Sequence, residues 1–144
     1  MTILYLDTSA LVKRYFREPY SDELLSRWRS AAQIVTSFVT YAETMASMYR
    51  KKREANLSET LMGKIASSFQ RDWESFIRIE VNQELNGTID RIVQTHPLRG
   101  FDAIHLASAL VIQEKMPEGF LFACFDERLS AAARLEGLET FPPE

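Results

Sequence analysis

The sequence is poor in cysteine and has no long hydrophobic run. Its single cysteine, Cys124, excludes a disulfide within the chain. This thiol lies in the apolar run from Phe120 to Phe125 with no activating base beside it, which is typical of a buried and inert cysteine. No stretch approaches the ~20 apolar residues that cross a bilayer, and the first apolar run is too short for a signal-peptide core. We therefore expect a cytoplasmic protein that has no membrane partner.

Positive charge is not in excess either. The chain carries 17 lysines and arginines against 20 acidic residues, for a formal net charge of -3. Nucleic-acid-binding proteins usually have a basic balance, so the composition alone neither supports nor excludes such a partner. Glycine and proline number only five each, and no repeat or low-complexity linker divides the 144 residues. The length and the 46% hydrophobic content therefore indicate one globular domain over residues 1–144.

Short apolar runs alternate along the chain with segments of helical spacing. These runs predict strands at 3–6, 34–37, 76–81, 120–125 and, at an edge, 138–141. Two of the intervening helices, at about 38–76, are expected to form a helical hairpin. Nearly all-apolar strands between helices are typical of a parallel sheet that is covered on both faces and joined by right-handed crossovers. The sequence therefore predicts an α/β sandwich.

Four acidic residues fall where such a sheet binds its ligands, outside the carboxyl ends of the strands. Asp7 ends the first strand and Asp126 ends the run from Phe120 to Phe125. Asp102 lies in the first turn of its helix, and Glu43 lies in the first two turns of the helix after the second strand. Any one of them alone has a simpler interpretation as a helix cap or a solvated acid. Together we expect them to point toward one edge of the sheet.

The surroundings of two of these acids favour a functional interpretation. Asp102 shares a narrow polar stripe with His105 and Ser108 on a helix that is otherwise apolar almost all round, and Glu43 stands at the margin of an apolar face. Half-buried carboxylates that point at one place repel each other unless they share protons or bind a divalent cation. Without a cysteine cluster or paired histidines, the donors suit Mg²⁺ or Mn²⁺ better than Zn²⁺. The expected chemistry is phosphoryl transfer, in which such ions activate water and neutralise charge on a phosphodiester.

Two further features allow more than one interpretation. We interpret His105 as a histidine that hydrogen-bonds within the core rather than as a general base, and we leave it out of the catalytic set. The basic run Arg50, Lys51, Lys52 and Arg53 is either a solvated helix C-terminus or a patch that contacts RNA phosphates. Arg50 lies two turns beyond Glu43 on the same helix face, beside the expected acidic site.

Four segments, in order and spacing along essentially the whole chain, resemble PIN-domain proteins, specifically the VapC-type ribonuclease toxins of type II toxin-antitoxin systems. The segments are Leu6 to Lys13, Thr36-Ser37 with Tyr41 to Glu43, Arg99 to Leu110, and Phe125 to Leu129. The resemblance implies a PIN-like three-layer α/β/α sandwich whose central parallel sheet has the strand order 3-2-1-4-5.

The same resemblance also implies an activity and partners. It implies an endoribonuclease that holds Mg²⁺ or Mn²⁺ between Asp7, Glu43, Asp102 and Asp126, forms a homodimer, and is inhibited by a VapB-type antitoxin. Glu127 directly follows Asp126, so we choose Asp126 as the fourth acid because it stands at the strand end.

Other classes of protein remain as alternatives. A haloacid-dehalogenase-type phosphatase requires a second aspartate two positions after the first, where this chain has Ser9. A response-regulator receiver requires a pair of acids at the first strand, which is not evident. A catalytically silent PIN-like module that only binds a partner remains open.

The apolar residues of the N-terminal helices also have two interpretations. They either complete the core or anchor an interface with a second copy or an antitoxin. The residues concerned are Tyr15, Phe16, Leu24, Leu25 and Trp28.

Overall fold

Five parallel strands form the central sheet of the protein. The computed structural model describes residues 2–116 and 119–144. The strands are β1 (Thr2–Leu6), β2 (Ala31–Ser37), β3 (Ile77–Ile79), β4 (Phe120–Ala123) and β5 (Thr140–Phe141). Their order is β3-β2-β1-β4-β5, which confirms the order that the family resemblance implies. The strands are added outward from β1, first through β2 and β3 on one side and then through β4 and β5 on the other. The carboxyl ends of β1 and β4 therefore border the crevice where open α/β sheets bind ligands.

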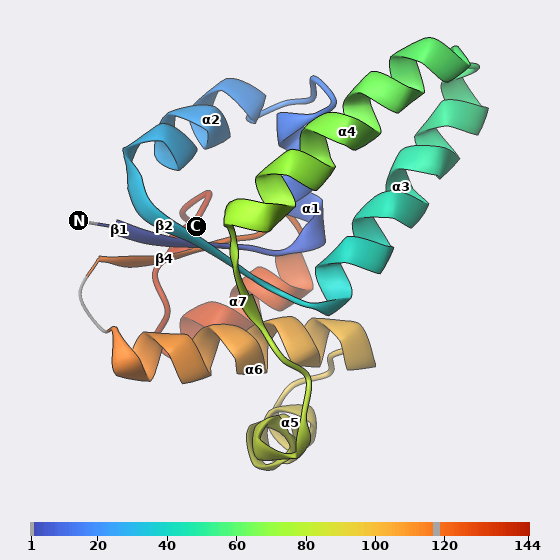
Figure 1. The fold of residues 1–144 in the computed structure, drawn as a ribbon. Helices are drawn as coiled ribbons and strands as arrows, with labels where there is room; N and C mark the ends of the chain where they lie inside the picture. Colours follow the sequence, from blue (N-terminus) through green and yellow to red (C-terminus); the bar gives the residue numbers. More distant parts are fainter. Residues whose placement is uncertain (1, 117–118) are drawn as a thin grey trace.

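Helices cover both faces of the sheet, as the sandwich prediction requires (Figure 1). One layer holds α1 (Thr8–Leu11), the short 3-10 turn η1 (Val12–Arg14), α2 (Ser21–Ser30), α3 (Val39–Ala55) and α4 (Glu59–Ser75). The other layer holds α5 (Gln83–Thr95), α6 (Gly100–Lys115) and α7 (Glu127–Leu135). Helices on both faces bury both sides of β4 and of β1 from Ile3 onward, which explains why these residues are apolar.

The alternation of side chains along β1 divides the core into two clusters. Ile3 and Tyr5 face α5, α6 and α7, whereas Leu4 and Leu6 face α1 to α4. Successive strand residues point to opposite faces, so both halves of the core start from this one strand. Asp7 comes next in the alternation, directly after the last residue of β1. The strand thus delivers its carboxylate to the sheet edge.

The strand lengths differ from those expected at two places. β3 contains three residues rather than the six of 76–81, since Glu80 and Val81 are exposed beyond the pairing with β2. β2 begins at Ala31, earlier than the expected residue 34, although Ala32 and Gln33 are exposed. Backbone pairing with β1 extends this strand past its apolar part, and hydrophobic pattern alone does not reveal such an extension.

The chain turns back between α3 and α4 at Asn56, which adopts the left-handed conformation that asparagine tolerates at helix ends. Ser58 then caps α4 by accepting a hydrogen bond from the Leu61 amide at 3.0 Å. The first turn of α3 packs against α4 through the rings of Tyr41 and Phe69, whose centroids lie 5.4 Å apart.

The apolar residues of the N-terminal helices pack inward. Leu24 is fully buried, and the Trp28 ring contacts the Phe76 ring at a centroid distance of 5.6 Å. The Tyr15 hydroxyl donates a hydrogen bond to Asp72 at 2.6 Å. Tyr15, Phe16, Leu24 and Trp28 therefore belong to the core on the α1 to α4 face, as the first of the two interpretations has it, whereas Leu25 is half-buried.

None of the helices in the described ranges 2–116 and 119–144 is long and apolar enough to span a bilayer.

Candidate active site

The four acids singled out in the sequence line one cavity at the carboxyl edge of the sheet. The cavity has a volume of about 480 Å³, and each acid reaches it from a different part of the chain. Asp7 follows β1, Glu43 belongs to α3, Asp102 belongs to α6, and Asp126 follows β4 as the N-cap of α7. The structure therefore brings together residues that are up to 119 positions apart, since Asp7 and Asp126 mark the two ends of that span.

Asp7 is fixed by the short helix that it starts. Its Oδ1 accepts hydrogen bonds from the Ser9 hydroxyl at 2.7 Å and from the Ala10 amide at 2.9 Å. The Ser9 hydroxyl oxygen also accepts a hydrogen bond from the Phe125 amide at 2.9 Å, which ties the end of β1 to the end of β4. Burial raises the pKa of the Asp7 carboxyl, and His105 and the two donors oppose this rise only in part.

Glu43 is held through one of its two oxygens. Oε1 accepts a hydrogen bond from the Thr8 hydroxyl at 2.7 Å and lies 2.8 Å from Nε2 of His105. Burial on its own would raise the pKa of Glu43, but the hydrogen bonds from His105 and Thr8 hold it below the usual glutamate range. This carboxylate is therefore the most firmly ionised of those with a resolved shift in the cavity.

Asp102 and Asp126 both line the cavity, and their charges interact. Asp126 accepts a hydrogen bond from the Leu129 amide at 2.9 Å, the usual geometry of an aspartate that caps a helix. Burial raises the pKa of Asp102, and the nearby Asp126 charge raises it further. The Arg99 guanidinium opposes this at 3.8 Å, but its side chain is 82% exposed, so water screens much of its charge.

The cavity offers oxygen donors to a cation. His105 uses both ring nitrogens on protein partners, Tyr5 and Glu43, so it has none left for an ion. The buried Cys124 thiol donates to the Asp126 carbonyl oxygen at 3.4 Å, and burial raises its pKa, so it stays a thiol rather than becoming a thiolate ligand. The remaining donors are carboxylate oxygens, which suit Mg²⁺ or Mn²⁺.

The carboxylates stand around the cavity rather than converging on a point. Within residues 2–116 and 119–144, no three histidine, cysteine or acidic side chains are arranged to hold a metal ion together as they stand. Two of the acids, Asp7 and Asp102, have raised pKa values. A cation bound at this cavity would supply positive charge that favours their ionised forms.

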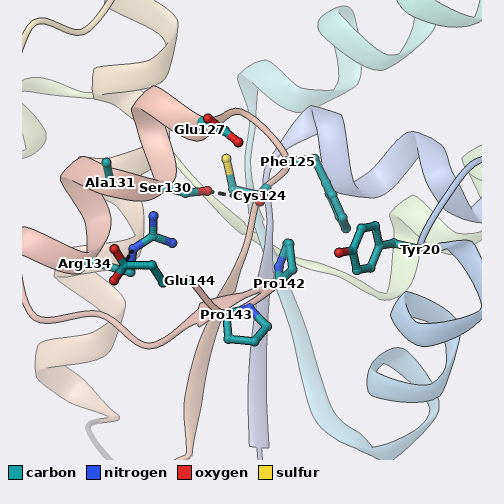
Figure 2. A pocket seen from close by; sticks show the side chains of 10 residues that line it. All are labelled: Tyr20, Cys124, Phe125, Glu127, Ser130, Ala131, Arg134, Pro142, Pro143 and Glu144. Atoms are coloured by element: carbon teal, nitrogen blue, oxygen red, sulfur yellow. Dashed lines mark hydrogen bonds and ion pairs between the residues drawn. The ribbon is translucent and has the colours of Figure 1, made fainter.

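Glu127 belongs to a different cavity from Asp126. This second cavity, of about 550 Å³, lies near the C-terminus and is lined also by Tyr20, Ser130 and Arg134 (Figure 2). The choice between the two neighbouring acids thus falls on Asp126, because it alone of the pair lines the cavity with Asp7.

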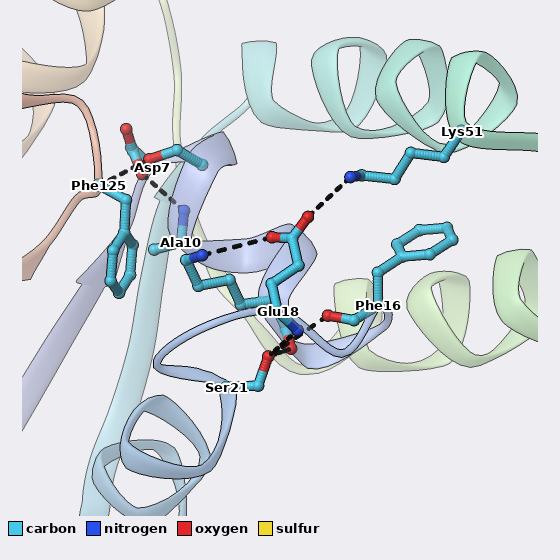
Figure 3. A network of polar contacts seen from close by, with 9 residues as sticks. Asp7, Ala10, Phe16, Glu18, Ser21, Lys51 and Phe125 are labelled. Carbon is cyan, nitrogen blue, oxygen red and sulfur yellow. Dashed lines mark hydrogen bonds and ion pairs between the residues drawn. The ribbon is translucent and has the colours of Figure 1, made fainter. Parts of the chain in front are cut away.

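Only one residue of the basic run reaches the acidic cavity. Arg50 is exposed and lines it, whereas Lys51 donates a hydrogen bond to Glu18 at 2.7 Å, away from the cavity (Figure 3). Lys52 pairs with Glu59 at 2.9 Å, and Arg53 is exposed. The four cations therefore do not form one continuous patch at the site.

Several residues around the cavity were not singled out from the sequence. Thr8 and Ser9 were overlooked as hydrogen-bond donors to the acids, although both directly follow Asp7 in a capping pattern that local spacing reveals. Arg99 also lines the cavity, three residues before Asp102 at a helix start. Tyr5 carried no signal, since its partner His105 lies 100 residues away.

Comparison with known proteins agrees with this architecture. Residues 4–135 match the protein family described as PIN domain. Ribonuclease VapC45 of Mycobacterium tuberculosis (strain CDC 1551 / Oshkosh) is 30% identical over 148 residues, which cover 100% of this chain and 98% of that protein.

Solved structures share the fold at lower identity. A toxin-antitoxin complex from Klebsiella pneumoniae contains a similar chain, with a TM-score of 0.63 and 18% identity over 89% of this chain and 90% of that one. VapBC-1 from nontypeable Haemophilus influenzae is similar with a TM-score of 0.66 and 14% identity over 96% of both chains. The matching family region contains the whole acidic cavity, from Asp7 to Asp126, and the chain therefore belongs to the PIN domain family.

Proposed function

We propose that this protein is a metal-dependent endoribonuclease that acts as the toxin of a VapBC-type pair. The observation that carries the proposal is the single cavity that Asp7, Glu43, Asp102 and Asp126 line together, which offers carboxylate oxygens to a hard divalent cation. The full-length relative named as a ribonuclease supports RNA as the substrate. The reaction is hydrolysis of an RNA phosphodiester bond.

In this proposal the four acids are both the catalytic residues and the ligands of Mg²⁺ or Mn²⁺. Such an ion, when bound, activates water and neutralises the charge that develops on the phosphodiester. Asp7 and Glu43 each accept hydrogen bonds from protein donors at one oxygen, Oδ1 and Oε1, and both residues line the cavity. The protein thereby fixes the direction of these carboxylates before any ligand binds.

Arginines at the rim would hold the RNA backbone. Arg50 and Arg99 both line the cavity and are exposed, so their guanidinium groups can reach phosphate oxygens in the bidentate way that arginine favours, Arg99 by leaving Asp102 at 3.8 Å. Arg53 is also exposed, whereas Lys51 and Lys52 must first leave Glu18 and Glu59. We therefore propose RNA contacts along residues 50–53 with Arg50 as the principal one.

The proposal includes protein partners and a location. The similar solved chains are described as parts of toxin-antitoxin complexes, which supports a VapB-type antitoxin as the inhibitor. A homodimer is proposed on the family resemblance. Because RNA is the proposed substrate, we also expect the protein to be cytoplasmic.

The test is RNA cleavage by the purified chain without its antitoxin. A panel of structured RNAs is incubated under single-turnover conditions with Mg²⁺, Mn²⁺ or EDTA. We expect cleavage with either ion and none with EDTA. Asp7→Asn should lower the rate by about 100-fold or more, because several kcal/mol of charge stabilisation depend on the metal site.

Glu18→Gln is the matched control, since it also neutralises one partly buried acid but lies outside the cavity. Its rate should equal that of the wild-type protein. Cleavage that persists in EDTA or in Asp7→Asn would overturn the proposal. RNA binding without cleavage under any condition would instead identify a catalytically silent PIN-like module.

A further inference from the structure

A buried chain of hydrogen bonds runs from the middle of β1 to the acidic cavity. The Tyr5 hydroxyl lies 2.9 Å from Nδ1 of His105, and Nε2 of the same ring lies 2.8 Å from Oε1 of Glu43. Tyr5 is fully buried and His105 is 2% exposed, whereas the Glu43 side chain is 28% exposed at the cavity. The chain thus starts in the core and ends on a carboxylate that faces solvent.

The core holds both rings of this chain in place. The Tyr5 ring stacks on Phe122 at a centroid distance of 5.3 Å and meets the His105 ring edge-on at 6.0 Å. β1 and α6, which carry the two rings, are central elements of the fold. A side chain whose rotamer is locked by packing on two sides can serve as a fixed support for a flexible one.

The direction of the hydrogen bonds follows from the chemistry of the groups. A tyrosine hydroxyl, with an ordinary pKa of about 10, keeps its proton at neutral pH, so Tyr5 can donate to Nδ1 at 2.9 Å. A neutral imidazole that accepts at Nδ1 carries its proton at Nε2, and this proton points at Glu43. Tyr5 thereby selects the tautomer of His105 that donates to the carboxylate.

Glu43 shows the result of this support. Its Oε1 accepts from both His105 and Thr8, whereas within the described residues Oε2 makes no hydrogen bond. We propose that Tyr5 and His105 are positioning residues that hold Glu43 so that Oε2 is the oxygen that binds the divalent cation. This inference rests on the proposed function. It gives His105 a role other than general base, since neither ring nitrogen is free to take a proton from water.

The test measures Mn²⁺ binding to the purified protein by titration calorimetry, in the absence of RNA. His105→Leu removes the donor and should weaken Mn²⁺ binding by about 10- to 100-fold, the usual loss when a group that orients a metal ligand is removed. His105→Gln retains an N-H donor at a similar distance from the backbone and should restore most of the affinity. Tyr5→Phe removes only the hydroxyl and should weaken binding less than His105→Leu does.

His96→Leu is the matched control. His96 is also buried, and its Nε2 lies 2.7 Å from Oε2 of Glu136, but neither residue lines the acidic cavity. This variant loses a histidine-glutamate pair of the same geometry, and its Mn²⁺ affinity should equal that of the wild-type protein.

Each outcome decides the matter. If His105→Leu and Tyr5→Phe bind Mn²⁺ as tightly as the wild-type protein, the inference is wrong while the proposed function stands. If His105→Gln loses as much affinity as His105→Leu, the histidine acts through packing and not as a donor, which also overturns it. A wild-type protein that binds no Mn²⁺ and cuts no RNA overturns the proposed function and the inference together. If His105→Leu does not fold, Tyr5→Phe decides by itself, because it retains the packed ring.

Discussion

The protein treats its acidic side chains in two different ways. Glu18, in the loop before α2, receives hydrogen bonds from Lys51 at 2.7 Å and from Lys13 at 3.4 Å (Figure 3). Burial would raise the pKa of Glu18, but these two lysines hold it below the usual range. Asp7, directly after β1, accepts hydrogen bonds from the neutral Ser9 hydroxyl and Ala10 amide, and burial raises its pKa.

Under the proposed function, this difference distinguishes a structural acid, Glu18, from a ligand of the cation, Asp7. Glu18 is compensated within the protein, so it joins the turn after η1 to the far part of α3. Asp7 and Asp102 are not compensated in this way, since burial keeps the pKa of each raised, and a ligand that carries positive charge would favour their ionised forms. Perturbed pKa values of this kind gather at functional sites for this reason.

Removing one charge from each region tests whether Glu18 is compensated by the protein and Asp7 is not. Glu18→Gln leaves Lys13 and Lys51 without their shared partner and should lower the free energy of unfolding by about 1 kcal/mol, a value kept small by partial exposure. Asp7→Asn retains both hydrogen bonds to the side-chain oxygen and removes a buried charge. It should leave the free energy of unfolding unchanged or raise it. Urea unfolding at pH 7 without metal measures both.

The pH dependence of the same two variants shows whether charge causes these changes. The pKa of Glu18 is lowered in the folded protein, so its stabilising effect is present above about pH 4 and is lost as the pH falls through the native value. The pKa of Asp7 is raised, so its destabilising effect is absent below about pH 4 and grows as the pH rises through the native value. Both differences from wild type should therefore shrink toward acid pH, from opposite signs. A large loss of stability in Asp7→Asn at pH 7 would mean that Asp7 is a structural cap.

A smaller effect separates the cations of the two regions. Arg50→Ala removes a guanidinium that lines the cavity and should reduce the slope of log K for RNA binding against log salt by roughly 0.7, the value for one single-strand phosphate contact. Lys51→Ala removes an ammonium already paired with Glu18 and should change the slope less. Filter binding of a cleavage-resistant RNA at several salt concentrations gives both slopes. Equal slopes for Arg50→Ala and wild type would remove Arg50 from the RNA interface.

The sequence predicts much of the arrangement because local signals and topology agree. The runs before Asp7 and Asp126 are apolar enough to indicate buried parallel strands, and parallel strands direct their carboxyl ends to one edge. That rule selected the four acids, and the family resemblance supported them, whereas the strand order came from the family resemblance alone. The structure confirms the order and brings the four acids to one cavity, while their roles as ligands remain a proposal.

Other features depend on contacts that no local pattern encodes. The basic run gives no sign that Lys51 is paired. Its partner Glu18 lies 33 residues earlier, in a loop whose path only the fold determines. The pairing of Tyr5 with His105 spans 100 residues and depends on the packing of α6 against the sheet. A single sequence carries no signal for such long-range pairs, so the support of Glu43 could not be predicted.

The effect of Mn²⁺ on thermal stability tests most directly whether the acidic cavity binds a divalent cation. If the cavity acids are kept for a divalent cation, saturating Mn²⁺ should stabilise the wild-type protein and Glu18→Gln alike, by about 2.7 kcal/mol at 100 times the dissociation constant. Asp7→Asn should gain much less, because it has lost one of the ligand charges. An equal gain in Asp7→Asn, or no gain in the wild-type protein, would contradict the account.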